Sequence, residues 1–345
     1  MKLESDLPTL VIFTNAAAWP SAASGPASAD RVLESPPVRT ARPWNELVVS
    51  WNVEPAVGSG VVVEAQALLG ERWTRWYRLG DWSLDGLQPV RRTSWEGESD
   101  ADGEVKTDTL VMRGAADGVR VRLKLVGTLA EMPDRLRWVG LAVCDSNDRS
   151  VPRAPRLDVR GLTLDVPERS QVSYAEGRAW CSPTSVSMLL GWWAWRLGRP
   201  ELDRDVPEVA AGVHDPGWPG TGNWPFNTAY AGSFPGMRSC AARLRDLRDV
   251  EDLVAAGIPV VLSVNAPALR GEPLTPDGGH LVICVGFTGE GDLVVNDPWA
   301  RLEEGQRVRK VVLRGHAERA WEHAHRMAYL VAPEEIARAF PAVWR

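Results

Sequence analysis

The chain has 345 residues, and its 44% hydrophobic and 24% charged content is typical of a soluble globular protein with material for two domains. Its 39 Lys and Arg against 45 Asp and Glu leave a formal net charge of −6 at pH 7. Nucleic acids and anionic membrane surfaces bind basic patches, so we expect neither as a partner. No apolar run is as long as a membrane-spanning helix requires, so the sequence predicts no membrane span.

The N-terminal segment contains one short apolar run, Leu10 to Phe13, followed by small residues. Glu4 and Asp6 stand where a signal peptide has basic residues, and the apolar run is too short for the core of a signal peptide. We therefore expect residues 1–30 to be a non-cleaved, poorly ordered leader. The expected location is cytoplasmic by default, with export by another route left open.

Residues 31–150 show the alternation of apolar and polar positions that is typical of strands with one buried face. The candidate strands are residues 61–69, 119–125 and 136–144. Asp102-Gly103 and Asp117-Gly118 are typical of hairpin turns between such strands. This half of the chain therefore predicts an antiparallel β-sandwich.

The chain holds 17 Trp, a large number for its length. Those of the predicted sandwich include Trp51, Trp73, Trp76, Trp82 and Trp95. They form either its core or an exposed binding platform, and the core is favoured for most of them. A glycan or protein contact through the sandwich is left open.

The character of the sequence changes after residue 150. Residues 151–165 are polar and contain Pro152 and Pro155, which predicts a linker. The candidate helices and strand beyond it are residues 185–197, 246–256 and 258–264. Gly257 suits the C-terminal end of the second helix. We therefore predict an α+β fold class, with the β-sandwich followed by a mixed domain over residues 166–345.

The chain has four cysteines, which are scattered without the C-x-x-C spacing of a disulfide scaffold or a zinc cluster: Cys144, Cys181, Cys240 and Cys284. His323 and His325 lie two residues apart without acidic or cysteine neighbours, so we interpret them as surface residues. We predict no metal site and no cofactor, and we expect a reducing compartment.

One of these cysteines, Cys181, begins the segment CSPTSVSMLL, which has the pattern of a helix start. Pro183 suits the first turn of a helix, where its missing N–H is no loss. The helix dipole and the free backbone N–H groups at such a position favour a thiolate. On this segment alone, a purely structural cysteine remains the alternative.

A histidine and an aspartate are predicted to meet in the segment GGHLVICVGFTGEGDLVVNDP. The candidate strands are residues 281–287 and 293–295. If the turn between them centres on Gly289 and Glu290, His280 and Asp297 face each other at the open end of the hairpin. A carboxylate beside an imidazole fixes its tautomer and orientation, as in a catalytic triad. An ordinary histidine at a strand end is the alternative.

Five motifs occur in the second half in this order: VPERSQ (166–171), WCSPTS (180–185), GTGNWPFNTAYAG (220–232), GGH (278–280) and NDP (296–298). Through them, this half resembles a papain-like cysteine peptidase of the bacteriocin-processing (peptidase C39-like) type, in its stand-alone form with an N-terminal β domain. The resemblance implies that Cys181 is the nucleophile, His280 the general base and Asp297 the residue that orients His280. It also implies that Gln171 donates to the oxyanion, although Gln171 lies farther from the cysteine than in papain. Ser182 stands where many members have Gly.

The segment from residue 214 to 236 is rich in Gly and Pro, so we predict an irregular loop there. Its aromatic side chains either wall a peptide-binding cleft or pack on the core. The candidate substrate-binding residues are Trp180, Trp224, Asn227, Tyr230 and Gly279. Gly279 would leave the approach to His280 free of side chains.

The sequence as a whole predicts a cysteine-dependent hydrolase that cleaves peptide or isopeptide bonds through a Cys-His-Asp triad and a thioester intermediate. Its expected partner is a peptide or protein substrate. Two alternatives remain. One is an acyltransferase on the same fold, in which an amine replaces the water. The other is a non-catalytic peptide-binding module, and the presence of all three triad residues argues against it.

Overall fold

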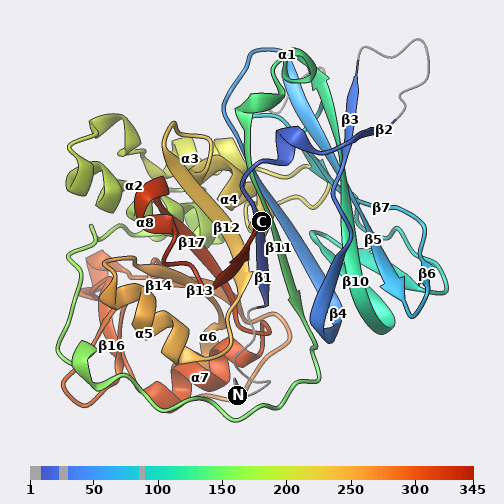
Figure 1. Cartoon of the computed structure of the whole chain (residues 1–345). Coiled ribbons are helices and arrows are strands. Elements are labelled where there is room, and N and C mark those ends of the chain that lie inside the picture. Colours follow the sequence, from blue (N-terminus) through green and yellow to red (C-terminus); the bar gives the residue numbers. More distant parts are fainter. Residues whose placement is uncertain (1–8, 23–29, 85–89) are drawn as a thin grey trace. The chain divides into compact units, whose positions relative to one another are not determined.

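The computed structural model describes residues 9–22, 30–84 and 90–345 (Figure 1). The chain forms two compact units, each built from separate stretches of sequence. Unit 1 comprises the residues up to Arg149 together with His214–Pro235 and Ala342–Arg345. Unit 2 comprises Ser150–Val213 and Gly236–Pro341. The units therefore alternate along the chain, which differs from the predicted succession of two continuous domains.

Unit 1 contains one hydrogen-bonded sheet of twelve strands within the described residues. The strands are β1 (Leu10–Phe13), β2 (Ser21–Ala22), β3 (Arg31–Glu34), β4 (Val38–Val53), β5 (Ser59–Leu69), β6 (Arg72–Trp73), β7 (Tyr77–Trp82), β8 (Thr93–Ser94), β9 (Gly103–Lys106), β10 (Thr109–Gly127), β11 (Leu136–Cys144) and β18 (Ala342–Trp344). Its main path is β18-β1-β11-β4-β10-β5-β7-β8, and β1 and β18 are parallel. The three predicted strands are confirmed in β5, β10 and β11, while the sandwich stays a prediction.

The two predicted hairpin turns have different outcomes. At Asp102-Gly103 the backbone N–H of Asp100 donates to the carbonyl of Gly103 at 2.9 Å, which closes a turn as predicted. The prediction is wrong for Asp117-Gly118, because β10 continues through it. A Cβ at Gly118 would lie 2.9 Å from the backbone oxygen of Val38 on β4. This glycine therefore serves the close approach of two strands rather than a turn.

The predicted leader is partly an ordered strand. Residues 1–8 and 23–29 lie outside the described residues. In the remainder, β1 is buried and pairs with β11 on one side and with β18 on the other. The prediction of a poorly ordered leader is therefore wrong for β1, because its four apolar residues complete the hydrogen bonding of two neighbouring strands.

The predicted loop between residues 214 and 236 contains a helix, α4 (Trp224–Ala231), so that prediction is wrong. Asn223 caps this helix by accepting a hydrogen bond from the N–H of Phe226 at 3.1 Å. The ring of Phe226 lies against Trp51 and Trp82, with centroids 6.3 and 5.3 Å apart. Proline in the first turn and a capping asparagine start helices, so the same residue types that suggested a loop begin α4.

The tryptophans of unit 1 lie only partly in its core. Trp51 and Trp82 are buried, as predicted. Trp73 and Trp76 are half-buried, and the guanidinium of Arg120 lies over both rings, 4.7 and 5.2 Å from their centroids. The prediction of a core position is therefore wrong for this pair, whose rings are covered by a surface arginine. It is also wrong for Trp95, which is 41% exposed.

Unit 2 contains a six-stranded antiparallel sheet within the described residues. Its strands are β12 (Met237–Arg243), β13 (Val260–Asn265), β14 (Gly279–Phe287), β15 (Leu293–Asn296), β16 (Arg309–Val312) and β17 (Met327–Pro333). The order is β12-β17-β13-β14-β15-β16. The sheet therefore brings together β14, β15 and β16, the strands of the predicted histidine and aspartate and of the segment that follows them.

The helices of unit 2 are α2 (Cys181–Leu197), α3 (Val206–Val213), α5 (Leu247–Ala255), α6 (Ala266–Leu269), α7 (Arg314–Glu322) and α8 (Glu334–Ala337), while α1 (Thr128–Glu131) and α4 belong to unit 1. The two predicted helices are confirmed as α2 and α5. Helix α2 packs against β14 and β17 and ends at Gly198, which is left-handed with φ +63. Across the described ranges, no helix combines the length and the apolar character needed to cross a membrane.

The predicted linker, residues 151–165, lies in unit 2 and is tied to it by ion pairs with buried aspartates. Arg153 Nη2 lies 2.7 Å from Asp246 Oδ1 and 2.6 Å from Asp249 Oδ1. These two aspartate side chains are only 7% and 2% exposed. The backbone N–H of Arg156 donates to Glu251 Oε2 at 2.6 Å. The chain is therefore anchored to unit 2 from Arg153 onward.

Limited trypsin digestion of the full chain is expected to cut first after Arg149, which is exposed, and to spare Arg153 and Arg156. The two fragments should separate in denaturing gels and stay together in native size exclusion, because His214–Pro235 belongs to unit 1. Arg149→Gln should remove the first cut. First cuts within residues 180–300, or fragments that part without denaturant, would contradict this division into units.

Candidate active site

Cys181 is the first residue of α2 and is half-buried. Its sulfur accepts hydrogen bonds from the backbone N–H groups of Ser182 and Leu281 and interacts with the side chain of His280. Burial raises the pKa of this thiol, but the His280 hydrogen bond and charge, together with the two N–H groups, outweigh burial and lower the pKa below its ordinary value. The surroundings of Cys181 therefore favour the thiolate.

The other two cysteines of unit 2 have the opposite surroundings. Cys240 and Cys284 are fully buried in strands β12 and β14. Burial raises the pKa of Cys284 to about 12 and raises that of Cys240 further. Neither thiol forms an appreciable thiolate near neutral pH, so the two are structural cysteines.

His280 lies near the start of β14 and is 8% exposed. Its Nε2 lies 2.8 Å from Asp297 Oδ1, which is the predicted side-chain contact. The turn is centred on Gly289 and Glu290 as predicted, because β14 and β15 pair Ile283 with Asn296, and Asp297 follows the end of β15. The two side chains therefore meet beyond the last paired residues. Since Asp297 occupies Nε2, the other ring nitrogen is the one available to Cys181.

Both carboxylate oxygens of Asp297 are engaged. Oδ1 accepts from His280 and from the backbone N–H of Trp299 at 2.9 Å, and Oδ2 accepts from Lys310 Nζ at 2.9 Å. Burial raises the pKa of Asp297, but His280 and Lys310 outweigh it and hold that pKa well below its usual range. Burial also opposes the charge on His280, yet the hydrogen bonds to Asp297 and Cys181 raise its pKa to about 9. The arrangement therefore favours an ionised carboxylate beside an imidazolium.

Gln171 lies at the start of a 3-10 helix and is buried. Its Nε2 donates to the carbonyls of Gly177 and Arg178, at 2.9 and 3.0 Å. An amide nitrogen carries two hydrogens, so both are used within the turn that leads to Cys181. The oxyanion role of Gln171 therefore stays a prediction, and it requires the amide to be released from this turn.

Two of the predicted substrate-binding residues lie in unit 2. Trp180 directly precedes Cys181 and is half-buried, with its ring 6.1 Å from that of Tyr174. Gly279 directly precedes His280 and is exposed, and a Cβ there would meet nothing within 4 Å. Both positions are consistent with an open approach to the thiol, and their role in binding stays a prediction.

The other three, Trp224, Asn227 and Tyr230, lie on α4 in unit 1. Asn227 is fully buried, and its amide donates to the carbonyls of Thr221 and Asn223, both at 2.8 Å. Tyr230 is 6% exposed and packs edge-on against Phe234. Each has a packing or hydrogen-bonding role within unit 1, and the structure groups none of the three with Cys181 in one unit.

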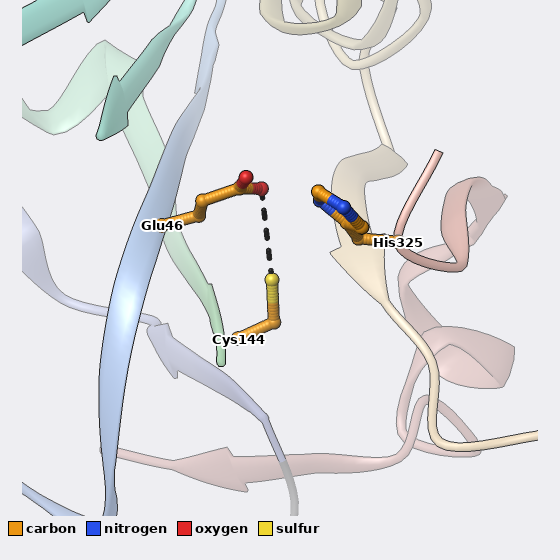
Figure 2. A group of neighbouring side chains, drawn as sticks. All are labelled: Glu46, Cys144 and His325. Atoms are coloured by element: carbon orange, nitrogen blue, oxygen red, sulfur yellow. Dashed lines mark hydrogen bonds between the residues drawn. The ribbon is translucent and has the colours of Figure 1, made fainter. Parts of the chain in front are cut away.

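Cys144 is the remaining cysteine and lies on β11 in unit 1 (Figure 2). Its Sγ donates to Glu46 Oε2 on the neighbouring strand β4, with 3.7 Å between the two atoms. A thiol that donates to a carboxylate is engaged as the neutral form. Glu46 therefore takes the hydrogen of this thiol, whereas the sulfur of Cys181 faces His280.

Two groups at the site were absent from the sequence-based prediction: the backbone N–H of Trp299 and the ammonium of Lys310. Trp299 stands two residues after Asp297, the spacing at which a carboxylate accepts from a following N–H. The sequence offers one weak indication of a special role for Lys310. The chain has only four lysines, and Lys310 is the single one after Lys124.

Unit 2 combines helices with a sheet, and in it the half-buried Cys181 thiol interacts with His280, which contacts the Asp297 carboxylate. Thiol, imidazole and carboxylate contacts of this kind are typical of the cysteine peptidases as a class. Residues 163–329 match the model of the Peptidase_C39 like family, and residues 30–142 match the model of the peptidase C39 N-terminal domain. These two matches confirm the resemblance found in the motifs.

Individual proteins are less similar to this chain than the two family models are. No curated protein matches the chain. Among solved structures, the chain is similar to the crystal structure of a "putative C39-like peptidase" from Bacillus anthracis, with 18% sequence identity and a TM-score of 0.38. The similarity covers 50% of this chain and 98% of that chain. At this level it carries no argument about the site.

Proposed function

We propose that this protein is a papain-like cysteine peptidase that cleaves peptide or isopeptide bonds with Cys181, His280 and Asp297 as its catalytic triad. The observation that carries the proposal is the position of His280, which interacts with the Cys181 thiol and has Asp297 Oδ1 2.8 Å from its Nε2. The lowered pKa of Cys181 supports a nucleophile and the raised pKa of His280 supports its acid partner.

In the proposed acylation step, the Cys181 thiolate attacks the carbonyl carbon of the scissile bond and the oxygen takes the negative charge. The free backbone N–H of Cys181 at the start of α2 donates to that oxygen, and Gln171 joins it if its amide is released. The His280 imidazolium then protonates the leaving amine, the C–N bond breaks and a thioester remains.

In the proposed deacylation step, neutral His280 takes a proton from water, whose oxygen attacks the thioester carbonyl. The C–S bond breaks, the acid leaves and the Cys181 thiolate faces the imidazolium again. Asp297 keeps the ring oriented through both steps. If an amine attacks the thioester in place of water, the same unit is an acyltransferase. If the unit binds peptides without cleaving them, it is a peptide-binding module.

We also propose that the sheet of unit 1 folds on itself as a β-sandwich. Support comes from β10, which pairs with β4 at one end and with β5 at the other, with register shifts between Val111 and Gly118. A strand that changes partners at a bulge allows one sheet to form two layers. Such a layer would present its outer face to a protein or glycan partner.

Labelling of the full chain with iodoacetamide tests the nucleophile. At neutral pH we expect Cys181 to react first, because its sulfur lies at a helix start and interacts with His280, which lowers its pKa. Cys240 and Cys284 should react only after denaturation. Peptide mapping by mass spectrometry identifies the modified residue, and faster reaction at Cys144 in folded protein would overturn the assignment.

The reaction itself is tested on a library of peptides with and without an added amine. Cleavage by the wild-type chain that is lost in Cys181→Ser supports hydrolysis. Products that carry the added amine, rather than water, would instead show the acyltransferase. If Cys181 labels rapidly but no peptide is altered, the binding module is favoured.

A further inference from the structure

The carboxylate of Asp297 is held by two cationic groups on two different strands. Oδ1 accepts from His280 of β14, while Oδ2 accepts from Lys310 Nζ at 2.9 Å. Lys310 lies on β16, where its backbone pairs with Val295, two residues before Asp297. Its side chain is 36% exposed and that of Asp297 is 15% exposed, so the pair is partly shielded from water.

We infer that Lys310 is a positioning residue, which holds Asp297 in place through Oδ2 and sets the charge that the Cys181–His280 pair experiences. The inference rests on the proposed cysteine peptidase activity. Lys310 touches neither the thiol nor a substrate in this proposal, because it acts through Asp297. With Oδ2 tied to Lys310 and the Asp297 backbone N–H donating to the carbonyl of Val308, the carboxylate has little freedom to rotate away from the imidazole.

The charged groups that act on the Cys181–His280 pair and on Asp297 come from different elements of unit 2. They are Cys181 of α2, His280 of β14, Asp297 after β15, Lys310 of β16 and Arg270 after α6. Arg270 is paired with Glu272 at 2.9 Å and interacts with Asp297 only through charge. Across β13 the residue that faces His280 is the uncharged Val264. Arg309, the neighbour of Lys310, bonds with Asn296 and with carboxylates and a carbonyl of residues 165–168.

The sign of the effect follows from charge. A cation near two titrating groups makes proton binding less favourable at both, so it lowers the pKa of the thiol and of the imidazolium. Removal of the ammonium should therefore raise both values and move the whole pH profile of the pair upward. For a partly exposed charge at this range, the shift should be about 0.5 to 1 pH unit. A residue that only stabilised the fold would lower the amount of active protein without moving the profile.

The test is the rate of iodoacetamide alkylation of Cys181 against pH in the full chain, for wild type, Lys310→Met and Lys310→Arg. We expect the profile of Lys310→Met to lie about 0.5 to 1 pH unit higher than that of wild type. Lys310→Arg keeps the charge and should restore the wild-type position. Lys124→Met is the matched control, since Lys124 forms a similar ion pair with Asp30 at 2.8 Å in unit 1.

The readout needs no substrate, so the two proposals can fail separately. If wild-type Cys181 shows only the slow, single titration of an ordinary thiol, the proposed function fails. If wild type shows the activated thiol and Lys310→Met has the same profile as wild type and Lys124→Met, the role of Lys310 is overturned. A Lys310→Met chain that does not fold is recognised by circular dichroism, and the Lys310→Gln variant then replaces it in the same measurement.

Discussion

His280→Ala is expected to lower kcat/KM for peptide cleavage by a factor of about 10³ or more, with folding intact. The loss is large because one side chain stabilises the Cys181 thiolate, donates the proton to the leaving amine and activates the water. Alkylation of Cys181 near neutral pH should slow in the same variant, since the thiol loses the partner that lowers its pKa.

Asp297→Asn should have a smaller effect, because it keeps the shape and one hydrogen-bonding group while it removes the charge. We expect a loss of about 10- to 100-fold, or about 1.4 to 2.8 kcal/mol of transition-state stabilisation. The alkaline limb of activity, set by His280, should move down from near pH 9 toward the ordinary value of about 6.5. This direction is opposite to that expected for Lys310→Met, because the two substitutions remove charges of opposite sign.

The raised pKa of His280 also links folding to pH. A histidine whose pKa rises from 6.5 to about 9 on folding adds stability that is fully present below about pH 6.5 and is lost as pH rises through about 9. His323→Ala is the matched control for both readouts, because His323 is an exposed histidine of the same unit. Equal activity in the His280 and His323 variants would contradict the triad.

Phe226→Ala is expected to destabilise unit 1 by about 3 to 5 kcal/mol, which is the usual cost of removing a buried phenylalanine ring. Phe226 is 1% exposed and lies between Trp51 and Trp82, so its loss opens a cavity among large rings that cannot easily collapse. The effect should appear in unit 1, although residue 226 lies within the stretch that the sequence assigns to the peptidase domain.

Hydrogen exchange in increasing denaturant measures the loss of stability separately for each segment of the chain. Peptides from β4 and β5 should lose protection in Phe226→Ala at lower denaturant, while peptides from β13 and β14 and the alkylation of Cys181 should change little. Phe287→Ala is the matched substitution in unit 2, where Phe287 is also 1% exposed, and should show the reverse pattern. Loss of protection in β13 and β14 on substitution of Phe226 would contradict the place of α4 in unit 1.

Much of the local structure was predictable because it depends on neighbours in the chain. The alternation in residues 61–69 and 136–144 matches β5 and β11, and the helical period after Cys181 matches α2. The outcome was different where local signals compete. Asp117-Gly118 has the residues of a turn, yet β4 and β5 pair with β10 on both sides of that position and keep it extended.

For the site, the residue types, their order and the strands that carry them can be read from the sequence. Cys181 at a helix start, His280 at a strand start and Asp297 after the next strand follow from patterns within a few residues. The groups that hydrogen-bond to the Asp297 carboxylate, and the unit to which residues 214–235 belong, follow from tertiary contacts. Lys310 reaches Asp297 because β16 pairs with β15, and α4 packs in unit 1 because its Phe226 fits between Trp51 and Trp82. The first contact depends on the pairing of two strands and the second on the packing of rings more than 140 residues apart in the chain, and no local pattern encodes either.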